Sequence, residues 1–150
     1  MEAVEARHGI GTDEERPRIV HWSLAKPSSF EDAYDSARQR HVDRRWPALR
    51  WFDFWKMVIK REPVVVRGAL SFGLKTFARA MQANGLIKAS WEDSQLDGLG
   101  AMVGAWACDE EALDKGVKLF EVPLMRDIGR YNEIDCKVME EIVRRLRTHH

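Results

Sequence analysis

The clearest hydrophobic pattern lies near the end of the chain, between residues 130 and 147. At about 100° per residue, one side of a helix over this range collects apolar side chains and the other collects charged ones. The apolar side holds Tyr131, Val138, Met139, Ile142 and Leu146, and the charged side holds Glu133, Lys137, Glu140, Arg144 and Arg147. Asp135 falls inside the apolar stripe. A buried carboxylate is costly unless it is paired, hydrogen-bonded or bound to a metal, so Asp135 needs a partner.

Two short runs of apolar residues predict strands. Residues 19–22 combine β-branched and aromatic side chains, and residues 64–66 are three valines between Pro63 and Gly68. The valine run is apolar throughout, which is typical of a central strand. We therefore expect it to be the best-defined strand of the protein.

The remaining periodic segments predict helices, joined by loops that contain glycine or proline. These helices are 28–41, a helix after Ser71 that ends at Asn84-Gly85, a small-residue helix 98–107, a charged helix or loop 109–118, and a short helix opened by Pro123 that leads into 130–147. The glycines of 98–107 permit close approach to a neighbouring helix. In the aromatic segment 49–59, bulky side chains point in all directions, which indicates packing between two elements; stacking on nucleic-acid bases is the alternative.

Composition limits the size and the class of the protein. The chain has 150 residues, 45% of them hydrophobic and 32% charged, which suits a single core. We expect a polar segment over 1–17, one domain over 18–148 and a tag remnant at 149–150. Lysine plus arginine number 24, as do aspartate plus glutamate, so no overall positive field attracts nucleic acid. Two distant cysteines and the lack of a signal peptide or membrane-spanning run predict a cytoplasmic protein without a membrane partner.

A resemblance to a known family rests on four segments in order. Residues 131–136 read Tyr-Asn-Glu-Ile-Asp-Cys, which resembles the third motif of tyrosine-type 3′–5′ exonucleases, where Tyr-x-x-x-Asp begins a C-terminal helix. The form is closest to the RNase H-like domains of RecB- and YprB-related nucleases. Residues 21–26 (His-Trp-Ser-Leu-Ala-Lys), 68–75 (Gly-Ala-Leu-Ser-Phe-Gly-Leu-Lys) and 97–102 (Asp-Gly-Leu-Gly-Ala-Met) are similar to three further segments of such domains.

The resemblance implies a fold and a chemistry. The fold is an α/β domain of RNase H-like type, helix-rich, with a small or incomplete mixed sheet. The chemistry is metal-dependent phosphodiester hydrolysis with Mg²⁺ or Mn²⁺, acting on DNA or RNA, chiefly at single-stranded ends. Asp135 would be a catalytic residue and metal ligand, and Tyr131 would orient water. Lys75, His21 and Lys26 would contact the substrate.

Three of the four family carboxylates are not found at their expected places. No Asp-x-Glu motif lies on an apolar strand, and the position that should end the strand near His21 with a carboxylate holds Lys26. The chain is then a fragment without its first strand, a member that has lost catalysis, or a member in which Glu31 or Asp32 takes the second position. An inactive module that binds nucleic acid or a protein partner is thus the alternative function, with Lys26 neutralising Asp135 instead of a metal.

Each candidate residue also has a structural interpretation. Asp135 is then a hydrogen-bonded or ion-paired core carboxylate, and Tyr131 a core aromatic whose hydroxyl reaches the surface. Lys75, one turn into its predicted helix, is placed either to hold a phosphate or simply to be solvated. His21 is then a satisfied histidine at a strand end.

Overall fold

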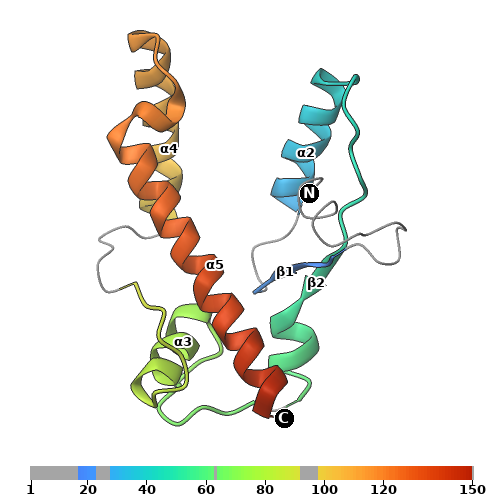
Figure 1. Ribbon diagram of the computed structural model, residues 1–150, viewed down its shortest axis with the longest axis vertical. Coiled ribbons are helices and arrows are strands. Elements are labelled where there is room, and N and C mark those ends of the chain that lie inside the picture. The colour runs from blue at the N-terminus through green and yellow to red at the C-terminus, as the bar shows by residue number, and fades with distance from the viewer. Residues whose placement is uncertain (1–16, 23–27, 63, 92–97, 150) are drawn as a thin grey trace. The chain divides into compact units, whose positions relative to one another are not determined.

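The computed structural model describes residues 17–22, 28–62, 64–91 and 98–149, and in these ranges the protein is helix-rich with one small sheet (Figure 1). The elements are β1 (Ile19–His21), α2 (Ser28–Arg40), β2 (Trp51–Asp53), the π-helix η1 (Trp55–Ile59), α3 (Leu74–Ala83), α4 (Gly98–Lys115), the 3₁₀ turn η2 (Leu119–Glu121) and α5 (Pro123–His149). Contacts divide the chain into two compact units, 1–65 and 66–150. The expected segment 1–17 lies almost wholly outside the described residues.

The first unit contains a strand–helix–strand arrangement. β1 and β2 are parallel, with Ile19 opposite Trp51 and His21 opposite Asp53, and α2 lies between them in the chain. Parallel neighbours need a crossover connection, which α2 and the segment after it supply. A strand at 19–22 and a helix at 28–41 are therefore confirmed. The sheet of the described residues is a parallel pair, where a mixed sheet was expected.

The valine run 64–66 is not a strand, contrary to its prediction. Val65 is 80% exposed and only Val66 is buried. The amide of Ala69 donates to the carbonyl of Val66 (3.0 Å), and Gly68 has φ 89°, so the chain turns immediately after the run. Because β-branched residues favour a strand only where a neighbouring strand can pair with them, the local preference has no effect here.

The second unit begins with α3, whose apolar face is buried as predicted. Phe77, Ala78 and Met81 lie on this face, and Phe77 is fully buried. Gly85, with φ 69°, ends the helix, and the amide of Leu86 donates back to the carbonyl of Met81 (2.9 Å). This hydrogen-bond pattern is the usual glycine-dependent helix end. The predicted stop at Asn84-Gly85 is confirmed.

The two long helices α4 and α5 pack against each other (Figure 1). A Cβ placed on Gly104 of α4 would lie 3.3 Å from both Ile128 Cδ1 and Leu124 Cδ2 of α5. The absent side chain therefore allows the helices to approach closely, as the small-residue pattern predicted. Both helices are longer than expected: the charged residues 109–115 continue α4, and α5 runs without a break from Pro123, because proline is well tolerated in a first helical turn.

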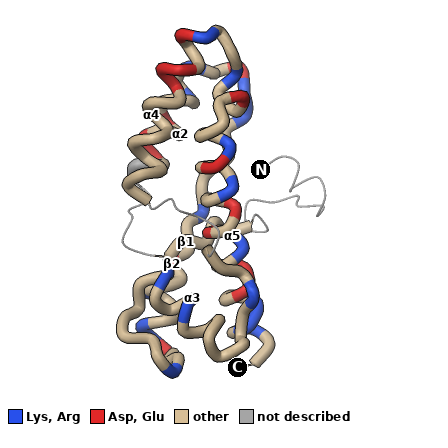
Figure 2. Tube along the Cα trace, turned by 90° about the vertical axis from the view of Figure 1, so that its left-hand side faces the viewer, with Lys and Arg blue, Asp and Glu red and all other residues tan. Residues whose placement is uncertain are grey.

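The predicted amphipathic character of α5 is confirmed. Tyr131, Val138 and Ile142 are buried, while the opposite side is charged. Figure 2 shows that residues of both signs of charge alternate along α5, and pairs such as Lys137–Glu133 (2.7 Å) join residues one turn apart. Such exposed pairs contribute little individually. None of the helices in the described ranges is both long and apolar enough to cross a membrane.

Candidate functional site

Asp135 has a hydrogen-bond donor as its direct partner. The indole Nε1 of Trp91 donates to Asp135 Oδ1 over 2.7 Å. Trp91 is 8% exposed and lies in the segment after α3, 44 positions before Asp135. Because a buried indole N–H has only its donor to satisfy, it requires an acceptor of this kind. The contact thus serves both groups.

Lys75, in the first turn of α3, completes the cluster. Its Nζ lies 5.0 Å from the centre of the Tyr131 ring and 5.8 Å from the centre of the Trp91 ring, within the range of cation–π attraction. The ammonium is also close enough to attract the charge of Asp135. We call Lys75, Trp91, Tyr131 and Asp135 the lysine–aspartate cluster.

Burial has the largest effect on the pKa of the Asp135 carboxyl. Removal from water raises the pKa of its carboxyl, and this effect outweighs the Trp91 hydrogen bond and the Lys75 charge, which both lower the pKa. The net direction is upward from the ordinary value. The surroundings therefore favour the protonated form of Asp135 more than water does.

A second carboxylate of α5 fixes the same segment. Glu141 Oε2 accepts the backbone amides of Lys88 (2.6 Å) and Ala89 (3.1 Å). The amide of Lys88 is the main cause of the lowered pKa of Glu141. Together with the contact at Trp91, this hydrogen bonding holds residues 86–91 along α5 at two points.

The structure gathers three of the predicted site residues, Lys75, Tyr131 and Asp135, in the second unit. His21 lies in β1 of the first unit, where its Nδ1 is buried without a hydrogen-bond partner among the described residues. Lys26 lies outside the described residues. Among the described residues, Trp91 donates a hydrogen bond to Asp135 and the Lys75 ammonium attracts its charge, which agrees with the structural interpretation of Asp135. Its pairing with a metal or with Lys26 stays a prediction.

The described residues do not fit the Mg²⁺ or Mn²⁺ site that the resemblance implies. None of them form a group of three or more histidine, cysteine, aspartate or glutamate side chains able to hold an ion. Asp135 faces an indole N–H and an ammonium, whereas Mg²⁺ and Mn²⁺ prefer several oxygen ligands. Glu31, one alternative carboxylate, accepts the indole N–H of Trp51 (2.8 Å), and Asp32 is exposed on α2.

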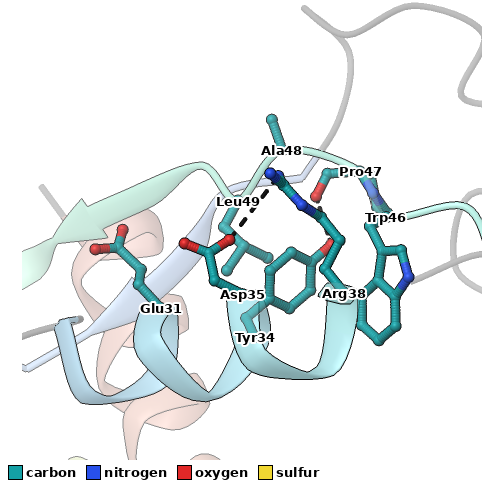
Figure 3. A pocket seen from close by; sticks show the side chains of 8 residues that line it. All are labelled: Glu31, Tyr34, Asp35, Arg38, Trp46, Pro47, Ala48 and Leu49. Carbon is teal, nitrogen blue, oxygen red and sulfur yellow. Dashed lines mark hydrogen bonds and ion pairs between the residues drawn. The ribbon is translucent and has the colours of Figure 1, made fainter. Parts of the chain in front are cut away.

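A cavity of about 330 Å³ lies in the first unit between α2 and the residues before β2 (Figure 3). Its lining residues already contact one another: the Tyr34 hydroxyl donates to the Pro47 carbonyl (2.6 Å), and Arg38 lies 3.8 Å from Asp35. The Trp46 ring meets the Tyr34 ring edge-on, with 5.1 Å between centres. The two Tyr34 contacts attach α2 to the segment that leads into β2, whereas Arg38 and Asp35 pair within α2.

The outer face of α4 is a second feature that the sequence interpretation missed. On the side away from α5, this helix presents five large apolar side chains that are between 54% and 75% exposed. They are Leu99, Met102, Val103, Trp106 and Leu113, and we call them the outer face of α4. Residues 98–107 contain no charged side chain, which already indicates a helix that is apolar on more than one side.

Trp91 was also missed as a site residue, because it lies between two predicted helices, in a part of the chain that was expected only to join them. The signal available was the need of a buried indole for an acceptor, together with the need of Asp135 for a donor.

Comparison of the chain with known family models, characterised proteins and solved structures finds no match.

Proposed function

We propose that this chain is a non-hydrolytic module of RNase H-like ancestry that binds a helix of another protein on the outer face of α4. The observation that carries the proposal is the exposure of that face. Ala101, Cys108 and Ala112 on the opposite side of α4 are buried, so the helix is apolar on both sides, and among the described residues only one of these sides is covered. A helix that is hydrophobic all round normally has neighbours on both sides.

The size of the face favours a macromolecular partner. Its five side chains fall within an arc of about 100° on the helix and extend over its successive turns. Contiguous apolar patches of this kind usually mark interaction sites, whereas isolated exposed hydrophobic residues need no explanation. Trp106, at 72% exposed, is the type of residue that most often dominates the binding energy of an interface.

The spacing of the face favours a helix as the bound element. Leu99, Trp106 and Leu113 recur every seven residues, and Met102 and Val103 fill the positions between the first two, whereas the equivalent positions before Leu113 are acidic. This is the spacing by which two helices interlock their side chains along a common seam. A partner with its own apolar stripe would add a third helix to α4 and α5.

Replacing Trp106 by lysine is expected to weaken binding of an amphipathic helix roughly tenfold or more, because it removes the central apolar contact. The probe is a fluorescent synthetic peptide with leucine at its a and d positions and glutamine elsewhere. Fluorescence anisotropy measures its affinity for the full chain. Leu70→Lys is the matched control, since Leu70 is 96% exposed in the loop before α3 and the change adds the same charge.

Two results would contradict the proposal. Equal losses for Trp106→Lys and Leu70→Lys, or no binding by the wild-type chain, would remove the outer face of α4 as a site. Light scattering that showed a wild-type dimer, converted to monomer by Trp106→Lys, would assign the face to a second copy of the chain.

Nucleic-acid hydrolysis is the second candidate function, favoured by the meeting of Lys75, Tyr131 and Asp135 at one place. Under the leading proposal, we expect the wild-type chain with Mn²⁺ to degrade single-stranded DNA and RNA no faster than Asp135→Asn does. The control is Asp127→Asn, an exposed carboxylate on the same helix. Degradation that Asp135→Asn abolishes and Asp127→Asn preserves would establish the nuclease function.

The cysteines support a proposed location. Cys108 is buried, Cys136 is exposed and both are free thiols. Free thiols of this kind are typical of a reducing compartment, so we propose the cytoplasm as the site of action.

A further inference from the structure

Charge is unevenly distributed along the outer face of α4. Its first ten residues are uncharged, whereas its last two turns carry Asp109, Glu110 and Asp114, all exposed. On the helix, Glu110 projects between Leu99 and Val103, while Asp109 and Asp114 border the face on either side. The acids therefore belong to the same surface as the apolar side chains.

None of these three carboxylates forms a described ion pair with another described residue. The described ion pair within α4 joins Lys115 to Glu111 (2.6 Å) and includes none of these three carboxylates. Carboxylates near a helix C-terminus also face the negative end of the helix dipole, where cations are favoured. A positively charged group brought over this end would be attracted by both the side chains and the backbone.

We propose that the partner helix carries lysine or arginine at the end that covers the last two turns of α4, so that the site selects an apolar stripe with one basic end. This inference rests on the proposed function and names the partner chemistry of that site. The apolar contacts supply most of the affinity, and the acids select the partner and its direction along α4. The same acids disfavour nucleic acid at this face, because phosphates would be repelled.

The test compares three peptides with the same leucine stripe and with lysine, glutamine or glutamate in the last turn of one end. In low salt, we expect the lysine peptide to bind the full chain about tenfold more tightly than the glutamate peptide, with the glutamine peptide between them. Added salt should reduce this difference, since exposed charges are screened. Moving the lysines to the other end of the peptide determines the direction of the bound helix.

The double variant Glu110→Lys, Asp114→Lys is expected to reverse the preference. The matched control, Glu133→Lys, Glu140→Lys, changes the net charge equally but lies on the exposed side of α5, where both acids pair within their own helix. A control that reverses the preference as strongly would show a general effect of net charge and overturn the inference.

The outcomes separate this inference from the function on which it rests. Equal binding of all three peptides, still weakened by Trp106→Lys, would overturn the charge selection and leave the binding function intact. No binding of any peptide would overturn both. Tighter binding of single-stranded DNA than of the lysine peptide would assign the surface to a nucleic acid and overturn both as well.

Discussion

Phe77→Ala is expected to lower the free energy of unfolding by about 3 to 5 kcal/mol, the usual cost of removing a buried aromatic ring. Phe77 is fully buried in α3 and is the largest of the completely enclosed side chains. The loss combines the apolar surface no longer removed from water with the cavity that remains where neighbours cannot close it. Urea unfolding followed by far-UV circular dichroism measures the change.

Arg79→Ala is the matched control for this variant. Arg79 lies two residues further along the same helix, is exposed, and changes to the same residue. We expect its effect to remain within about 0.5 kcal/mol, as for most surface substitutions. A Phe77→Ala effect as small as that of the control would show that α3 does not contribute its apolar face to the core.

The main helices could be predicted from the sequence because their patterns are local. In α5, Tyr131, Val138 and Ile142 repeat with the period of a helix, and all three are buried. In α3, the stop at Gly85 follows from a backbone conformation that glycine adopts readily. These features need no knowledge of what the helices pack against.

The prediction of a strand at 64–66 was wrong because a strand depends on a neighbour and not on its local pattern alone. Three valines favour extended backbone, but a strand also requires a neighbour that accepts and donates its ladder hydrogen bonds. The extent of α4 was underestimated because charged residues such as Glu111 and Lys115 indicate either helix or loop, and their mutual ion pair is seen only in the folded chain.

The candidate site could be predicted only in part. The need of Asp135 for a partner follows from its place on the helix, yet Trp91 is 44 positions away and the Lys75 contacts come from another helix. Such pairings depend on how the elements pack, which periodicity does not report. The outer face of α4 was overlooked because a helix in a small domain needs only one apolar face for packing, whereas α4 has two.

Asp135→Ala is expected to cost about 1 to 3 kcal/mol, because it leaves the buried indole N–H of Trp91 without an acceptor. Asp135→Asn retains an acceptor oxygen and removes the charge that burial disfavours. We therefore expect Asp135→Asn to be at least as stable as the wild type at neutral pH. Urea unfolding of the two variants beside the wild type measures the contrast, and equal losses would contradict the assigned role of the Trp91 contact.

The pH dependence of the same comparison follows from the direction of the pKa shift. The folded-state pKa of Asp135 is raised, so the stabilisation associated with its proton is fully present below the unfolded-state pKa and is lost as pH rises through the folded-state pKa. The advantage of Asp135→Asn over the wild type should then be small in acid and grow toward neutral pH. Glu141 acts oppositely, since its lowered pKa gives stability that is lost as pH falls, but it is unchanged in both proteins and cancels from their difference. A difference that stays constant from acid to neutral pH would show that the pKa of Asp135 is the same in the folded and unfolded chain, so that the Trp91 hydrogen bond and the Lys75 ammonium together compensate fully for its burial.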